Sequence, residues 1–276
     1  MIRTLTAEQA QTAIDWAAAE GWNPGLSDLP CFLAQDRGLF LAVEQDGQLQ
    51  SVIAATRYLH AFGFIGFYIA RPESRGHGHG MAVWQAAMQR LEGRLVGLDG
   101  VVAQQANYRK SGFHLAWNNI RFGGLVQGLP APEGRLVPAS AVPFDRLSAL
   151  DAMVFPAPRP GFLQCWLGAP GHVALALLRD GAAVGYGVIR PARQGHKIGP
   201  LVAENAADAQ ALLAALVQAA GAREIFLDVP EPHRVGVALA ESCGLKPVFE
   251  TARMYTGPAP TLPLEGIFGI TTFELG

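Results

Sequence analysis

The sequence has little charge, few cysteines and no long uninterrupted apolar run. Only 16% of its 276 residues are charged, 50% are hydrophobic, and the formal net charge is −2. A chain so close to neutrality offers no basic surface for nucleic acid, so any anion-binding site must be local. The high apolar content is typical of a globular protein that builds a core, and it argues against disorder. We therefore expect no nucleic-acid partner.

Signals for membrane insertion and export are also missing. The longest apolar runs, such as residues 209–222, are interrupted by Gln or end before the roughly 20 residues that a bilayer requires. The first residues, MIRTLTAEQAQ, contain neither an apolar core nor a small-residue cleavage site, so they do not resemble a signal peptide. These absences predict a cytoplasmic protein with no membrane partner.

The cysteines form no disulfide or metal pattern. Cys31, Cys165 and Cys243 are odd in number, far apart and outside any C-x-x-C pair. Each lies in an apolar stretch that resembles core, which disfavours a catalytic thiol. The pattern predicts free thiols in a reducing cytoplasm.

Periodicity and turn signals divide the chain into two similar halves. In the first half we expect helices at residues 7–20, 81–91 and 104–110 and strands at 39–43, 49–58, 64–70, 95–102 and 113–122. A stretch rich in Pro and Gly, residues 128–134, then marks a linker. Beyond it, the hairpin signal Asp180-Gly181 follows Asp46-Gly47 after 134 residues, and Gly244 follows Gly112 in a similar context after 132. The shared offset predicts two α+β domains of similar topology, residues 1–129 and 135–276.

The stretch FIGFYIARPESRGHGHG, residues 64–80, joins an apolar strand to a helix through a basic, glycine-rich turn. Gly76, Gly78 and Gly80 lack Cβ atoms, so the backbone can close around a phosphate and direct successive N–H groups towards it. Arg75 adds positive charge, and the start of the following helix adds the positive end of its dipole. The turn lacks the G-K-S/T of a P-loop and the G-x-G-x-x-G of a dinucleotide site. A plain glycine-rich surface turn is the alternative for this motif alone.

Two motifs give the chain a specific resemblance to a known family. Arg75-Gly76-His77-Gly78-His79-Gly80 matches the Q/R-x-x-G-x-G/A phosphate loop of the GNAT superfamily of acyl-CoA-dependent N-acyltransferases, and Asn107-Tyr108 precedes a K-S-G-F end as in that family. The whole chain resembles tandem GNAT proteins with a degenerate C-terminal half. The resemblance implies an α+β fold of two tandem GNAT-like domains, each with a central mixed β-sheet flanked by helices. It also implies that an acetyl group passes from acetyl-CoA, by direct attack, to a primary amine of a small molecule or a protein.

The resemblance assigns residues to the donor site. The strand end at residues 68–70 would leave its neighbouring strand and receive the pantetheine arm, with a backbone N–H as oxyanion donor. Tyr108 would be the general acid for the departing thiolate, and a core tyrosine that packs the short helix is the alternative. The residues expected to bind acyl-CoA are Tyr68, Ile69, Ala70, Arg75, Gly76, His77, Gly78, His79, Gly80 and Asn107.

The acceptor side is less clearly marked. Trp22, Asn23 and Asp28 occupy the loop region that shapes the acceptor pocket in this family, where Trp22 would form an apolar wall and Asp28 would hold an ammonium group. Packing of Trp22 on the core and a turn at Asn23 are the alternatives. No general base is assigned among the candidates Asp28, Glu73, Asp99 and His114. His77 and His79 have no carboxylate or Cys to complete a metal set, so we expect no metal.

The second half departs from both motifs. Residues 202–208 contain acids and no glycines where the phosphate loop would fall, and Ala240 stands at the position of Tyr108. This half would not bind CoA in the usual way; it would cover the acceptor cleft, contribute residues such as Arg159, Lys197 or Tyr255 to it, or act as a structural partner. A module that binds acyl-CoA without transferring the acyl group is the alternative function. The acceptor, the acyl chain and the oligomeric state stay open.

Overall fold

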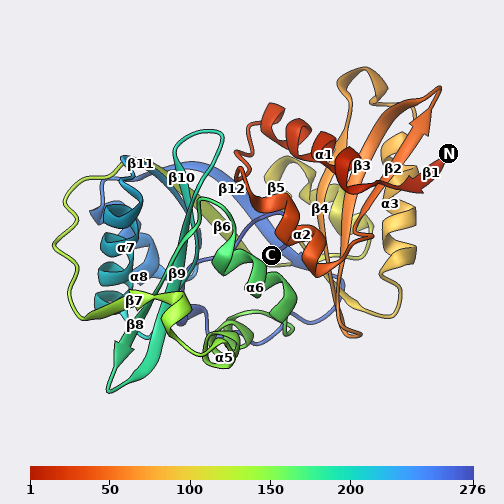
Figure 1. The fold of residues 1–276 in the computed structure, drawn as a ribbon. Coiled ribbons are helices and arrows are strands. Elements are labelled where there is room, and N and C mark those ends of the chain that lie inside the picture. The colour runs from red at the N-terminus through yellow and green to blue at the C-terminus, as the bar shows by residue number, and fades with distance from the viewer.

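The two halves of the chain repeat one order of secondary structure, as the computed structural model of all 276 residues shows (Figure 1). The elements of the first half are β1 (Ile2–Thr4), α1 (Ala7–Ala19), α2 (Asp28–Gln35), β2 (Phe40–Gln45), β3 (Gln48–Tyr58), β4 (Phe62–Ala70), η1 (Pro72–Ser74), α3 (His79–Arg90), β5 (Leu95–Val101), η2 (Val102–Gln104), α4 (Gln105–Lys110) and β6 (His114–Leu125). The elements of the second half are β7 (Arg135–Pro138), η3 (Ala139–Ala141), α5 (Phe144–Val154), α6 (Pro160–Gly168), β8 (Val173–Arg179), β9 (Ala182–Pro191), β10 (His196–Ala203), α7 (Ala206–Ala220), β11 (Glu224–Pro230), α8 (Arg234–Ser242), β12 (Lys246–Tyr255), η4 (Leu264–Gly266) and β13 (Ile267–Gly269). The predicted α+β class with a repeated architecture is confirmed.

One continuous sheet of 13 strands runs through both halves, and the halves exchange one strand each, β6 and β12. The strand order is β1-β2-β3-β4-β5-β12-β6-β11-β10-β9-β8-β7, with β13 paired to β10. β12 therefore lies against β5 of the first half, and β6 lies against β11 of the second, so both exchanged strands run through the middle of the molecule (Figure 1). The division into residues 1–129 and 135–276 remains a prediction. The sheet crosses this boundary, because β6 of the first half pairs with β11 and β12 of the second half pairs with β5.

Two equivalent ion pairs hold the exchanged strands in register. Arg253 of β12 binds Asp99 of β5 through hydrogen bonds of 2.7 and 2.6 Å, and Arg121 of β6 binds Asp228 of β11 at 2.7 and 2.8 Å. In each pair the two residues are direct partners in the sheet. All four side chains are at most 4% exposed, and charges buried this deeply are stable only with a partner.

Helices cover both faces of each half of the sheet. α3 packs on β2, β3 and β4, and α7 packs on β8, β9 and β10. Successive residues of a strand point to opposite faces, and alternate residues of β3 accordingly contribute to the cluster under α3 and to the cluster under α1 and α2. On that second face α2 packs against α6 of the other half, where the rings of Phe32, Phe67 and Trp166 join one apolar cluster. The core therefore continues from one half into the other.

The cysteines contradict the prediction of free thiols. Cys31 of α2 and Cys165 of α6 form a disulfide with a Cα–Cα distance of 5.2 Å, and only Cys243 is free. The two bonded cysteines are 134 residues apart, the offset that also separates the two hairpin turns. They occupy equivalent positions of the repeat and meet only because the halves pack through α2 and α6, which spacing along the chain does not reveal. The cysteines thus give no support for a reducing compartment.

No helix of the protein has both the length and the apolar character needed to span a bilayer.

Candidate active site

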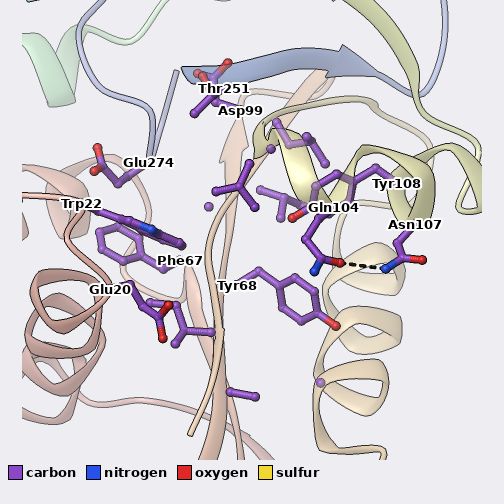
Figure 2. A pocket seen from close by; sticks show the side chains of 18 of the residues that line it. Glu20, Trp22, Phe67, Tyr68, Asp99, Gln104, Asn107, Tyr108, Thr251 and Glu274 are labelled. Atoms are coloured by element: carbon purple, nitrogen blue, oxygen red, sulfur yellow. Dashed lines mark hydrogen bonds between the residues drawn. The ribbon is translucent and has the colours of Figure 1, made fainter. Parts of the chain in front are cut away.

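A cavity of about 730 Å³ opens where strands β4 and β5 separate (Figure 2). The two strands pair in parallel only over residues 62–65 and 95–98. Beyond this point a bulge in β4 places Phe67 and Tyr68 opposite Ile53 of β3, and Phe67 has a φ of 48°. The end of β4 has no partner strand on the cavity side, so its backbone groups are free for an extended ligand.

The glycine-rich turn lies along this cavity. Gly76 and Gly78 have φ angles of 80° and 84°, in the left-handed region that favours glycine, and α3 begins directly after them without a side-chain cap. The first N–H groups of a helix have no partner within it, so an anion can bind them with support from the helix dipole. The Arg75 side chain lies beside the turn, where it bonds to Glu20 and to the carbonyl of Ala70. The arrangement fits a pyrophosphate.

Ten of the expected site residues line this one cavity: Trp22, Tyr68, Ile69, Ala70, Arg75, Gly76, Gly78, Gly80, Asn107 and Tyr108. The amide of Asn107 donates to Gln104 Oε1 at 2.7 Å (Figure 2). His77 and His79 are not part of the lining. Their two rings stack on each other, with centroids 6.4 Å apart. No group of three or more His, Cys, Asp or Glu is arranged to hold a metal ion.

Tyr108 is positioned by packing. Its ring stacks on Trp84 of α3 with centroids 5.6 Å apart, and a Cβ at Gly100 of β5 would lie 2.3 Å from the Tyr108 ring. Glycine at position 100 therefore makes room for the tyrosine. Burial, with a smaller contribution from Tyr68, raises the pKa of Tyr108 to about 12. The phenol is protonated at neutral pH and can donate a hydrogen bond into the cavity.

Asn23 and Asp28, which we expected in the acceptor pocket, lie outside the cavity lining. Asp28 is 1% exposed and accepts hydrogen bonds from Arg190 Nε at 2.9 Å and from the N–H of Gly25 at 3.0 Å. Asn23 exchanges two hydrogen bonds with the backbone of Gln194, at 3.0 and 2.8 Å. Both residues join the first half to the second, and no local sequence pattern predicts this role.

The second half supplies four cavity residues that sequence reasoning missed. Phe249 and Thr251 come from the exchanged strand β12, and Phe273 and Glu274 come from the C-terminal segment, residues 270–276. A Cβ at Gly66 of β4 would lie 1.9 Å from the carbonyl oxygen of Glu274, so this segment passes directly over the point where β4 leaves β5. No periodicity or motif marks these residues. The second-half residues expected to contribute are buried and do not line the cavity: Arg159, Lys197 and Tyr255.

The corresponding opening in the second half is filled by the chain itself. β10 and β11 pair only at residues 196–198 of β10, and β13 pairs with the later part of β10. The helix that follows, α7, is capped by Asn205, whose side chain accepts from the N–H of Asp208 at 3.0 Å. Arg179 binds both Glu204 and Asp208. The cap therefore occupies the N–H of Asp208, whereas α3 of the first half begins without a side-chain cap.

Comparison with known proteins gives matches to one superfamily in both halves. The acetyltransferase (GNAT) family matches residues 5–114, and the acetyltransferase (GNAT) domain matches residues 147–269. A holothin acyltransferase of Pseudoalteromonas sp. (strain SANK 73390) is 30% identical over 272 residues, which are 98% of this chain and 92% of that protein.

Solved structures support the fold. The crystal structure of a Pyrococcus horikoshii protein has a TM-score of 0.86 at 20% identity, covering 100% of this chain and 95% of that one. A tandem GNAT protein from the clavulanic acid biosynthesis pathway has a TM-score of 0.64 at 15% identity, covering 94% and 99%. At these identities the likeness concerns the fold alone.

The matches in both halves define an acyltransferase of the GNAT type. Given 30% identity over nearly the whole length to a holothin acyltransferase, the chain belongs to the GNAT superfamily. It is a tandem-domain, acyl-CoA-dependent N-acyltransferase, and the resemblance drawn from its two motifs is confirmed.

Proposed function

We propose that the protein transfers an acetyl group from acetyl-CoA to a primary amine of a small molecule, by direct attack. One observation carries the proposal: a single cavity is lined by the glycine-rich turn, by the free end of β4 and by Tyr108. These three features suit the phosphates, the pantetheine arm and the sulfur of one acyl-CoA molecule.

In this mechanism the protein binds and orients the donor through its backbone. The N–H groups at the start of α3, with Arg75, bind the pyrophosphate. The free end of β4 pairs with the pantetheine arm, and an N–H at the bulge polarises the thioester carbonyl. The amine then attacks the carbonyl carbon, the C–S bond breaks, and the Tyr108 hydroxyl donates to the departing sulfur.

The walls on the acceptor side favour a small molecule over a protein amine. Trp22 of the first half and Phe249 and Phe273 of the second line the cavity together. Arg121 links Trp22 to Phe273. Its Nη1 donates a hydrogen bond to the carbonyl of Trp22 at 2.7 Å, and its guanidinium lies 4.6 Å from the centre of the Phe273 ring. The second half thus acts as the cover of the acceptor site, and the relative that acylates holothin makes holothin the first acceptor to test.

A thiol-release assay with acetyl-CoA and the amines holothin, aniline and benzylamine tests the proposal. We expect release of CoA that depends on the acceptor and that equals the amount of acetylated amine measured by mass spectrometry. Saturable binding of acetyl-CoA without release in the presence of any of these amines would contradict transfer and favour an acyl-CoA-binding module.

A further inference from the structure

The active-site cavity is lined by three carboxylates, and one of them accepts no hydrogen bond from the protein. Glu20 is exposed and bonds to Arg75, and Asp99 is bound by Arg253. Glu274 is 3% exposed, and neither of its carboxylate oxygens accepts a hydrogen bond from the protein. Burial of a carboxylate without hydrogen bonds is unfavourable, so its retention in the cavity requires an explanation.

The segment that carries Glu274 is firmly anchored. Thr272 Oγ1 accepts hydrogen bonds from the backbone N–H groups of Glu274 and Leu275, at 3.1 and 2.9 Å. The Tyr58 hydroxyl donates to the carbonyl of Leu275 at 2.8 Å. The close approach of this segment to Gly66 leaves no space for a side chain between it and β4. The carboxylate therefore has a defined place above the bulge of β4, as a catalytic group requires.

Glu274 and the proposed acid lie on opposite sides of the thioester site. In Figure 2, Glu274 is beside Trp22 on one side of the end of β4, and Tyr108 is on the other. A thioester bound along β4 with its sulfur towards Tyr108 would therefore lie between Tyr108 and Glu274.

Charged residues of the neighbouring strands surround Glu274. Lys197 Nζ of β10 lies 3.9 Å from Glu274 Oε1 and has no hydrogen-bond partner in the protein. Burial first, and then Arg121, lowers the pKa of Lys197 to about 8, while Glu274 and Asp228 oppose this shift and Arg190 adds to it. Because 3.9 Å exceeds a hydrogen-bond distance, Lys197 leaves both carboxylate oxygens of Glu274 without a hydrogen bond.

We propose that Glu274 is the general base of the transfer, an inference that rests on the proposed function. The amine nitrogen forms its bond to the carbonyl carbon, and its N–H proton passes to the Glu274 carboxylate while the C–S bond breaks. The departing thiolate is held by the Tyr108 hydroxyl and takes up one proton through it. Glu274 then releases its proton to solvent and Tyr108 regains one, so the products are the amide and the free thiol.

Glu274→Gln tests the proposal because it keeps the size of the side chain and removes the base. The acceptor is whichever of holothin, aniline and benzylamine gives the highest wild-type turnover. We expect kcat to fall about 100-fold or more, with the Kd for acetyl-CoA within about twofold of the wild-type value. Glu265→Gln, at an exposed carboxylate of η4 outside the cavity, is the matched control and should keep the wild-type kcat.

Two further variants separate a base from a structural residue. Glu274→Asp keeps a carboxylate and should exceed Glu274→Gln in kcat by about tenfold. Glu274→Ala leaves space for formate, and added formate should restore kcat in a saturable way, which a structural role does not predict.

Each outcome decides between the proposals. The role of Glu274 as base would be overturned by any of three results: a near wild-type kcat in Glu274→Gln, weakened acetyl-CoA binding in that variant, or low activity that neither formate nor Glu274→Asp restores. In each of these cases the proposed function still stands, provided that the wild-type protein acetylates an amine. If the wild type acetylates none of the amines, the proposed function fails and this inference fails with it.

Discussion

Tyr108 has the chemistry of a hydrogen-bond donor more than that of a strong acid. Burial raises the pKa of its phenol to about 12, whereas a thiol has a pKa of about 8.5. Complete proton transfer to the thiolate is therefore uphill, and the first contribution of the phenol is the hydrogen bond that stabilises the leaving sulfur. We expect Tyr108→Phe to lower kcat about 10- to 100-fold, or about 1.4 to 2.7 kcal/mol, with unchanged affinity for acetyl-CoA. Turnover equal to that of the wild type would assign this ring to packing alone.

The raised pKa of Tyr108 also determines how this residue can affect the pH dependence of kcat. A phenol whose pKa is raised to about 12 keeps its proton in alkaline buffers. From about pH 8 to about pH 10 the wild type should therefore show no decrease in kcat that the Phe variant lacks. Parallel pH profiles of the two proteins measure this, and an alkaline decrease present only in the wild type would contradict the raised pKa.

At the scale of elements, the buried ion pairs determine how stably the exchanged strands are held. Asp228→Asn leaves the Arg121 guanidinium of β6 buried without its carboxylate partner. We expect this change to lower the free energy of unfolding by about 3 to 5 kcal/mol. The double variant Asp228→Leu with Arg121→Met removes both charges and should recover most of that loss. Urea denaturation of the wild type and of both variants measures the loss and the recovery.

An exposed pair supplies the control for this prediction. Arg193 and Asp15 also join the two halves, but their side chains are 46% and 55% exposed. Asp15→Asn should change the free energy of unfolding by no more than about 0.5 kcal/mol. Equally small changes in the free energy of unfolding for Asp228→Asn and Asp15→Asn would contradict the prediction that burial makes the ion pair important for stability.

The strand exchange also shows where sequence reasoning stops. The apolar run at residues 64–70, the glycines after it and the amphipathic helix are local patterns, and they placed β4, the turn and α3 correctly. The neighbour of β5 is not a local property. Arg121 and Arg253 stand 132 residues apart at equivalent positions, so either β6 or β12 would offer an arginine to Asp99. Only the packing of the two halves decides between them. For the same reason Glu274, in an aperiodic segment, could not be placed in the site from sequence.

At the scale of the whole molecule, the C-terminal residues connect the two clefts. β13 pairs with β10 and fills the opening of the second half. The next residues, 270–276, run to the opening of the first half and place Phe273 and Glu274 in its cavity. The second half therefore gives the cavity of the first half a wall and a carboxylate, so the two similar folds share this cavity.

The disulfide between α2 and α6 should stabilise this two-part structure chiefly by constraining the unfolded chain. Cys31 and Cys165 are 134 residues apart, and a disulfide typically contributes about 2 to 4 kcal/mol. We expect Cys31→Ser with Cys165→Ser to lower the free energy of unfolding by that amount, measured by urea denaturation without reductant. Because neither residue lines the cavity, kcat of the folded variant should stay within about threefold of the wild type.

Reduction and thiol counting provide the control for the disulfide. Alkylation of the unfolded wild type without reductant should modify Cys243 alone, and alkylation after reduction should modify all three cysteines. Reductant should destabilise the wild type and leave the double Ser variant unchanged, because only the wild type has a bond to lose. Three modified cysteines before reduction would mean that the thiols are free, as spacing alone predicts, and that α2 and α6 are held together by packing.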